Sequence, residues 1–588
     1  MPRALLYRIL DRHRVVVICL LGIGICAPCS AQVAAPVEPA ESVQKLGLDF
    51  WQWRAIYAPF TGDDVPRIEH PGGRRDWSSA SIANRRKDLQ RFESRFLSMK
   101  SATWSVPAQV DYRLLGSALA RVRWELDVNP RWSRDPNFYI EQTVTPLLEF
   151  MAVPGPYNES RSAELFKRID NIPSIIAAAE KNLNAPPAPF VKAAIESLSD
   201  IRVHLRTMAS SIQPVTTLDK TDLGSVVGRA ADSLEQFRSW LQRLLPTCSP
   251  NFAIGREAYI FFLHKVALLP YSPEELLAIG QQETARALAF LALETQRNKA
   301  VPQLQLLPNT EAWAKKEADD EEEIREFLKR RGILTVPNSM QHYTFRETPV
   351  YVKALSAFGE TDDFTSATRL RENGVRYIEP PSSDLDFFWG ASAKDPRPIV
   401  VHEGVPGHYF QLALSWANKD PIRRHFYDSS SNEGLGFYSE EMLLQSGLFD
   451  DSPHSREIVY KFMLLRAVGI ELDVRLALGE FTIDQGAAFL DETVGLGREM
   501  ATGGTTMFAL TPGVLVGYQT GKTDILRFLG EAKLKQGDDF DLRAFHDSLW
   551  TNGNVPIALQ RWEYLGLKDG VERLDTFSDA DSDSDGPY

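Results

Sequence analysis

The stretch Val401–Phe410, VHEGVPGHYF, places two histidines and a glutamate around a Pro-Gly pair. His402 and His408 are six residues apart, whereas the histidines of the HExxH zinc signature lie four apart on one helix face. Six residues of regular helix stop about 120° short of two full turns, so these histidines could not share a face. Pro406 removes a backbone donor and Gly407 permits unusual dihedral angles. The sequence therefore predicts a loop that brings the side chain of His408 close to that of His402. The alternative is that the two histidines are unrelated and lie on either side of a turn.

A metal site needs a third ligand, because catalytic zinc is held by three protein groups and keeps one position for water. Glu433, in SNEGLGFYSEE, lies 25 residues beyond His408, and Ser431 or Asn432 could cap the helix that carries it. His402, His408 and Glu433 would hold one zinc ion per chain, although manganese or cobalt would also suit this set. Glu403 would then take a proton from the water that the metal acidifies.

Glu440 follows Glu433 by seven residues and should lie on the same helix face. From there it could accept a hydrogen bond from a ligand imidazole and so support the site. The alternative is that Glu440 and Glu441 form a solvated pair.

Outside this region, residues 45–290 are predicted to form amphipathic helices separated by Pro or Gly. In residues 162–183, apolar side chains recur at helical spacing, with a break expected at Pro173. Ser272 and Glu275 predict a capping box. The charged stretch 311–332 is expected to be a solvated helix that ends at Gly332.

Residues 337–398 are aromatic and proline-rich, which is typical of short strands and loops, and helical patterns return after His402. The predicted fold is mainly α, with a small β element before the motif. The predicted organisation is a signal peptide (1–31), an N-terminal helical lobe (32–300), a catalytic metal-binding lobe (301–570) and an acidic disordered tail (571–588).

The chain has 588 residues, of which 44% are hydrophobic and 24% charged, as expected of a globular protein with a large core. The net charge of −13 and the absence of a basic stripe argue against a nucleic-acid partner. Beyond the predicted signal peptide, Cys248 is the single cysteine, which excludes an intramolecular disulfide and a cysteine-ligated metal.

The N-terminus has four arginines, then the apolar run VVVICLLGIGICA and a small-residue cleavage site after Ala31. This pattern predicts export to the periplasm or beyond, with no stable membrane span once the signal peptide is removed. A lipoprotein signal is less favoured, because Ile25 and Pro28 precede Cys26 and Cys29 where a small residue is wanted.

Four motifs together resemble the bacterial family catalogued as domain of unknown function 885, a relative of the gluzincin-like metallopeptidases: HEGVPGHYFQ, NEGLGFYSEE, PGVLVGYQTGKTDILRF and FHDSLWTNGNVPIALQRW. The resemblance covers about residues 45–565 and implies two helical lobes around a cleft that favours short peptides. This chain departs from the family pattern at Tyr409, Leu435, Gly436, Phe437 and Ala477. Ala477 stands where the family commonly has histidine.

Three further candidates lie within these motifs. Tyr518 and His546 match family positions and are candidates to donate hydrogen bonds to the oxyanion of a tetrahedral intermediate, although each could instead belong to the core. Arg561 could bind a substrate carboxylate or form a structural ion pair.

Together these features predict an exported zinc metallopeptidase that hydrolyses peptide bonds with Glu403 as general base. Two alternatives stay open. The first is a periplasmic binding or scaffold protein that retains the fold without catalysis, which the changes at positions 435 and 477 would explain. The second is a zinc hydrolase of non-peptide amides.

Overall fold

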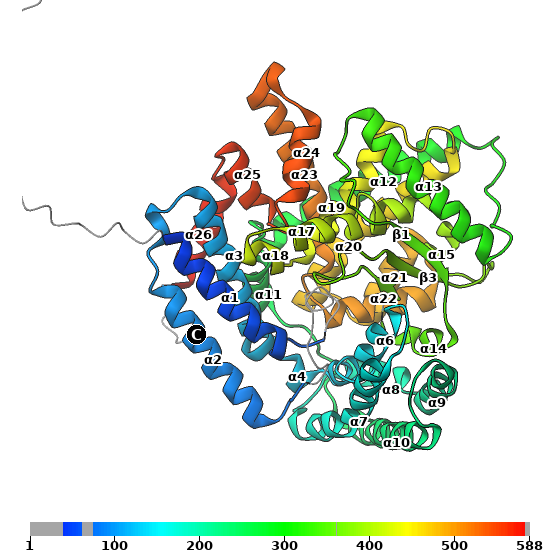
Figure 1. Ribbon diagram of the computed structural model, residues 1–588. Coiled ribbons are helices and arrows are strands. Elements are labelled where there is room, and N and C mark those ends of the chain that lie inside the picture. The colour runs from blue at the N-terminus through cyan, green and yellow to red at the C-terminus, as the bar shows by residue number, and fades with distance from the viewer. Residues whose placement is uncertain (1–38, 61–74, 360, 583–588) are drawn as a thin grey trace, which may run out of the picture. The chain divides into compact units, whose positions relative to one another are not determined.

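Helices dominate the computed structural model, which describes residues 39–60, 75–359 and 361–582 (Figure 1). The mainly α prediction is confirmed. The predicted signal peptide lies outside the described residues, which belong to one unit, Pro39–Tyr588.

The first part of the chain forms twelve α-helices within the described residues: α1 Pro39–Tyr57, α2 Ser79–Leu97, α3 Val106–Arg123, α4 Arg131–Arg134, α5 Pro136–Glu141, α6 Thr145–Ala152, α7 Glu159–Asn182, α8 Ala188–Ser197, α9 Ile201–Ile212, α10 Lys220–Leu244, α11 Arg256–Phe261 and α12 Pro273–Arg297. The capping box at the start of α12 is present, since Ser272 accepts from the backbone of Glu275 and Glu275 from that of Ser272. The break expected at Pro173 is wrong, because α7 continues through it.

The second part carries the sheet and the remaining helices: α13 Thr310–Arg331, β1 Tyr343–Glu347, α14 Val350–Lys353, β2 Asp362–Asp363, β3 Gly374–Ile378, α15 Phe387–Ser392, α16 Arg397–Ile399, α17 His408–Ala417, α18 Pro421–His425, α19 Ser429–Ser446, α20 Pro453–Leu478, α21 Ile483–Val494, α22 Arg498–Leu510, α23 Leu515–Gln536, α24 Leu542–Thr551, α25 Ile557–Leu565 and α26 Asp569–Ser582. The strands are ordered β1-β3-β2, with β1 parallel and β2 antiparallel to β3. The small β element predicted before the motif is therefore confirmed.

Helix α13 differs from the solvated helix expected for 311–332, although it ends at Gly332 in the left-handed conformation as predicted. One face packs against β1 and buries Trp313 and Leu328. Glu317 is fully buried there and accepts a hydrogen bond of 2.9 Å from the backbone N–H of Phe345. Burial raises the pKa of Glu317 to about 8.

Apolar side chains form two large cores. The first is built mostly from residues 43–268 and is completed by residues from 352–377, 422–426 and 555–574. The second is built mostly from residues 313–565. The predicted lobes 32–300 and 301–570 thus share core residues, and the cleft between them stays a prediction.

The tail predicted to be disordered from residue 571 is helical in its first part, so that prediction is wrong there. Helix α26 runs to Ser582, and its Val571 and Leu574 are buried in the first core. Arg573 forms a 2.6 Å ion pair with Glu275.

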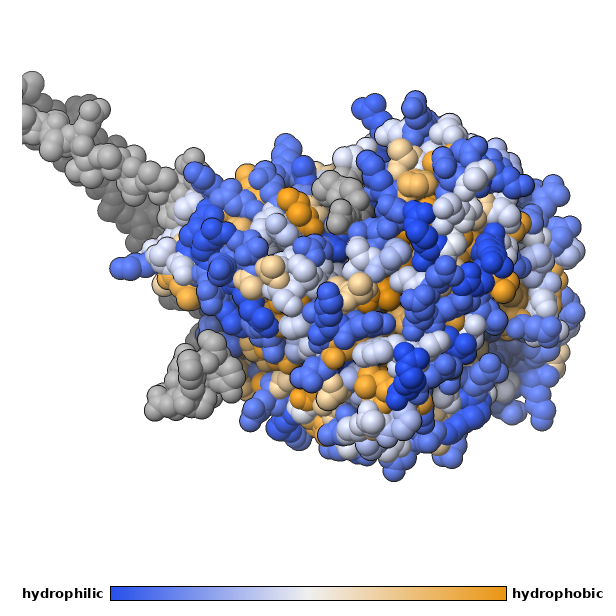
Figure 2. Space-filling view, turned by 90° about the horizontal axis from the view of Figure 1, so that it is seen from below, coloured by the Kyte–Doolittle hydropathy of each residue, from blue (hydrophilic) through white to orange (hydrophobic). Residues whose placement is uncertain are grey.

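Among the described residues, none of the helices has the length and apolar character needed to span a bilayer. The face in Figure 2 is largely hydrophilic, with apolar residues in scattered groups.

Candidate metal centre

The turn between the two histidines has the form that the Pro-Gly pair predicts. A widened helical turn, Val400–Gly404, carries His402, and the chain passes through Val405, Pro406 and Gly407 before α17 begins at His408. A Cβ atom on Gly407 would lie 1.7 Å from the carbonyl oxygen of His402, so only glycine can occupy this position. Trp550 holds the turn from outside by donating a 2.7 Å hydrogen bond to the carbonyl of Pro406.

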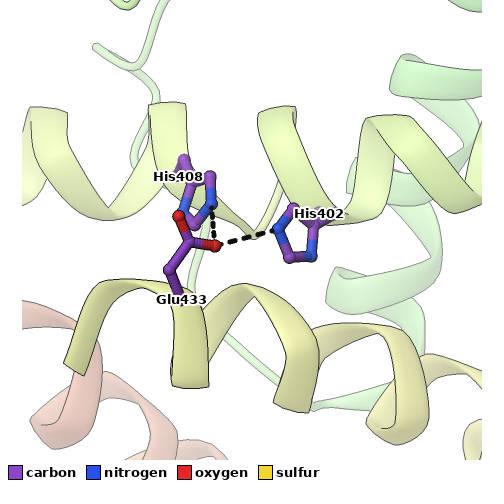
Figure 3. Close-up of side chains that lie close together, drawn as sticks. All are labelled: His402, His408 and Glu433. Atoms are coloured by element: carbon purple, nitrogen blue, oxygen red, sulfur yellow. Dashed lines mark hydrogen bonds and ion pairs between the residues drawn. The ribbon is translucent and has the colours of Figure 1, made fainter. Parts of the chain in front are cut away.

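The turn brings His402 and His408 to a single carboxylate oxygen of α19 (Figure 3). Glu433 Oε2 lies 3.3 Å from His402 Nε2 and 3.0 Å from His408 Nε2. Both imidazoles are buried, whereas Glu433 keeps 15% of its side-chain surface exposed. The donor atoms of the three residues predicted as ligands therefore surround one position, which is partly accessible to solvent.

The spacing of these atoms suits a zinc ion. Zinc–ligand bonds of about 2.0–2.1 Å in tetrahedral geometry place neighbouring donor atoms about 3.3 Å apart. The two nitrogen–oxygen distances lie close to that value, and the donor set of two imidazoles and a carboxylate is typical of hydrolytic zinc. Within the described chain, a second group, Glu321, Glu322 and His342, has donor atoms in similar reach, but Glu321 pairs with Arg325 and the other two are exposed.

Glu440 lies behind His402, where the helix periodicity places it. Its Oε1 is 2.7 Å from His402 Nδ1, which leaves Nε2 to face the metal position. Glu440 is completely buried, and Glu441 is buried and bonded to Lys522 at 2.9 Å, so the solvated-pair alternative is wrong. His408 Nδ1 is buried without a hydrogen-bond partner in the described chain.

When no metal is bound, the protonation states of His402 and Glu433 depend on each other and on their neighbours. Burial lowers the pKa of His402 and so does Arg466, but hydrogen bonds to Glu433 and Glu440 outweigh both and raise the pKa to about 9. Burial raises the pKa of Glu433, yet His408 and His402 hold it well below its usual range. Without metal, His402 is therefore an imidazolium between two carboxylates.

Glu403 lies next to the cluster with 21% of its side chain exposed. Burial opposes ionisation, but His402, His408 and Arg376 lower the pKa of Glu403, so it is a carboxylate. Arg376 Nη1, on β3, is 3.6 Å from Glu403 Oε1 and is anchored by Asp362 of β2 at 2.9 Å. The sheet thus supplies a cation, Arg376, beside the predicted base, and no sequence motif indicated this arginine.

Tyr518 reaches this region because α19 and α23 pack at very short range. A Cβ on Gly434 would lie 2.5 Å from Gly521 Cα, and one on Gly517 would lie 2.7 Å from Ser430 Cα. Burial raises the pKa of Tyr518 well above its usual value, and the nearby Glu433 raises it further. Its hydroxyl makes no hydrogen bond within the described residues, so it remains available as a donor.

His546 does not fit the predicted role of oxyanion donor. The ring is completely buried, its Nδ1 lies 2.8 Å from the carbonyl oxygen of Ile333, and its Nε2 lies 2.8 Å from the hydroxyl of Tyr438. Burial lowers the pKa of His546 to about 4, so the ring is neutral. It is a core histidine with both nitrogens bonded.

Arg561 likewise forms the structural ion pair that was the alternative to substrate binding. It is buried and contacts Glu531 at 2.7 Å and Asp569 at 3.0 Å. Its donors therefore serve α23 and α26 rather than a ligand.

Two departures from the family pattern lie in apolar surroundings. Leu435 belongs to the second core, and Ala477 to a third that contains Tyr259 and Phe262. Asp473, four residues before Ala477, accepts hydrogen bonds from the N–H groups of Gly513 and Leu515 at the start of α23. Asp473 therefore positions the helix that carries Tyr518.

A buried chain of amides links the C-terminal motif to both ligand helices. Gln411 of α17 donates to Asn554 at 3.0 Å and accepts from Asn432 of α19 at 3.1 Å. Asn432 directly precedes Glu433 in the chain. The C-terminal motif thus supports the orientation of the ligand helices.

The fold and the site define a mainly helical protein with a buried histidine–carboxylate cluster at a break between two helical segments. The chain belongs to the family described as bacterial protein of unknown function (DUF885), whose sequence model matches residues 64–562. No curated protein matches it.

Two solved structures share the fold. One, described as a lipoprotein of unknown function from Shewanella oneidensis, has 19% identity and a TM-score of 0.69, and the match covers 90% of this chain and 100% of that one. The other, described as a lipoprotein from Colwellia psychrerythraea, has 15% identity and a TM-score of 0.71, with coverage of 92% and 100%.

Proposed function

We propose that this protein is an exported zinc-dependent peptidase of the gluzincin-like type. The observation that carries the proposal is the convergence of His402 Nε2 and His408 Nε2 on one oxygen of Glu433, with the Glu403 carboxylate alongside. Zinc bound there would supply Lewis-acid activation of a water molecule and of the scissile carbonyl.

Three residues of the chain would supply the proton transfer, the oxyanion contact and the orientation of a ligand. Glu403 is ionised and partly exposed, so it can accept a proton from the attacking water and deliver it to the leaving amine. Tyr518 has an unengaged hydroxyl in the field of Glu433 and can donate to the developing oxyanion. Glu440 holds His402 in the tautomer that exposes Nε2.

Peptides are the favoured substrates because the ligand set and the gluzincin-like resemblance point to acyl transfer to water. A cleft between two helical lobes, as the resemblance implies, would favour short peptides. Leu435 and Ala477, which motivate the scaffold alternative, are both buried in apolar cores. That alternative predicts a protein that need not hold stoichiometric zinc, so metal analysis distinguishes it from the peptidase. Non-peptide amides remain a substrate class to be tested against peptides.

Export is supported by the signal-peptide pattern at residues 1–31 and by the two similar structures described as lipoproteins. Mass spectrometry of the mature N-terminus tests this. A terminus at Gln32 indicates cleavage after Ala31, and a lipid-modified Cys26 or Cys29 would show anchoring instead.

The first test is metal content by plasma mass spectrometry of the purified protein, beside His408→Ala and Glu433→Ala. We expect about one zinc per wild-type chain, lost in both variants. A peptide library and a matched set of non-peptide amides then identify the substrate class. Absence of zinc after reconstitution would overturn the proposal, and cleavage of the amides alone would replace peptides as the substrate.

A further inference from the structure

A buried arginine, Arg466 of α20, contacts the metal centre from behind. Its Nη2 lies 3.1 Å from Glu440 Oε1, and its Nη1 donates to Glu440 Oε2 at 3.4 Å. The guanidinium therefore holds both oxygens of the carboxylate that contacts His402. Arg466 keeps only 5% of its surface exposed.

His402 Nδ1 and Arg466 Nη2 both lie within ion-pair distance of Glu440 Oε1, at 2.7 and 3.1 Å. Arg466 Nη2 is 3.2 Å from His402 Nδ1, but a guanidinium can only donate. Nδ1 must also donate if Nε2 is to ligate a metal. Their close approach therefore places two donor groups beside one carboxylate oxygen, Glu440 Oε1, so the position of this carboxylate determines the position of the imidazole.

Aromatic rings fix the guanidinium in place. Its Cζ lies between 5.1 and 5.8 Å from the ring centroids of Phe388, Phe437, Phe462 and Tyr518. Such rings attract a cation and leave little space for another rotamer. One of them is the tyrosine assigned to the oxyanion.

We propose that Arg466 is a positioning residue of the metal centre: by holding both oxygens of Glu440, it fixes His402 with Nε2 toward the zinc. This inference rests on the proposed zinc site and extends it to a residue outside all four family motifs. Arginine is required because only a planar fork bonds two carboxylate oxygens and packs between aromatic rings.

The test measures zinc affinity of the full chain by competition with a chromophoric chelator, which is independent of any peptidase activity. The variants are Arg466→Met, Arg466→Lys, Glu440→Gln and the double variant Arg466→Met/Glu440→Gln. We expect Arg466→Met to weaken zinc binding about tenfold or more, as loss of outer-sphere support does in other zinc sites. Arg466→Lys should recover part of the loss, and the double variant should be no weaker than Glu440→Gln alone.

Arg131→Met is the matched control. Arg131 also contacts two carboxylates, Asp135 and Glu141, but in the N-terminal part of the chain. Its loss should leave zinc affinity unchanged. If Arg466→Met does not fold, the zinc affinities of Arg466→Lys and Glu440→Gln, each compared with that of the wild type, test the inference instead.

Unchanged or tighter zinc binding in folded Arg466→Met, or additive losses in the double variant, would overturn this inference and leave the zinc proposal intact. Wild-type protein that binds no zinc would overturn both.

Discussion

Helices α7 and α19 bury their residues in contrasting ways. Within α7, the buried positions are apolar except for Ser162, and they follow one face: Leu165, Ile169, Ile172, Ile175, Ile176 and Ala179. Within α19, nearly every residue from Ser429 to Leu444 is buried, and the set includes serines, glycines, Asn432, Glu440 and Glu441. The first helix is built for stability and the second for a site, so substitutions in the two should have separable consequences.

The largest effect is expected at Glu403, beside the site that α19 supports. Glu403→Gln should lower kcat/KM by about 10²–10⁴ because it removes the general base. Zinc content and thermal stability should stay at wild-type values, as measured by plasma mass spectrometry and calorimetry. Retention of more than a tenth of the activity would assign the base to another residue.

The opposite pattern is expected from Ile172→Ala on α7. Ile172 is completely buried in the first core, so its truncation should lower the free energy of unfolding by about 2–5 kcal/mol. Urea titration measures this, and zinc stoichiometry of the folded protein should not change. Loss of zinc from folded Ile172→Ala would break the separation between the two regions.

Gly434→Ala tests the contrast between α7 and α19 with a substitution in α19. The added methyl group would lie 2.5 Å from Gly521 Cα, so α19 and α23 must move apart. We expect a loss of about 1–3 kcal/mol in stability, as for other overpacked sites, together with reduced activity because Tyr518 moves with α23. Gly224→Ala on α10, where a methyl group would contact nothing within 4 Å, is the matched control.

Zinc affinity should depend on pH through His402. Its pKa of about 9 in the metal-free protein exceeds the ordinary 6.5, so zinc must displace a proton below pH 9. Apparent affinity should rise by up to about tenfold per pH unit and level off above that pKa.

Stability of the metal-free protein should change in the opposite sense: the contribution of His402 is complete below pH 6.5 and is lost as the pH rises through about 9. Chelator competition and urea titration across this range measure both, and a flat affinity profile would contradict the assignment.

The smallest effect is expected at the start of α7. Asn158 caps this helix by accepting a 2.9 Å hydrogen bond from the N–H of Arg161. Asn158→Ala should lower stability by about 1 kcal/mol and leave both zinc binding and activity unchanged. Asn158→Ser, which retains a capping oxygen, should recover most of the difference.

The sequence predicted what is encoded locally. The 3.6-residue period identified the face of α7, and motif spacing identified His402, His408, Glu433 and Glu440 as neighbours. It missed Arg376 and Arg466 because strands and helices distant in the chain deliver them to the site. Arg466 did carry one unused signal: it interrupts the apolar run FMLLRAVGI, where a charge must find a buried partner.

The errors have a common physical origin. Periodicity cannot tell a solvated charged helix from one that packs a face on a sheet, as α13 does on β1. Family position alone cannot tell a catalytic histidine from His546, whose two hydrogen bonds depend on tertiary contacts with Ile333 and Tyr438.

The hydrogen bond from Trp550 to Pro406 spans 144 positions, and it closes the loop between the two histidines. During synthesis, the ribosome adds Trp550 long after both ligand helices have emerged. A nascent chain that lacks its last forty residues has every proposed ligand and no brace on the turn that brings them together. The turn at the centre therefore depends on a residue that is added only when the chain is almost complete.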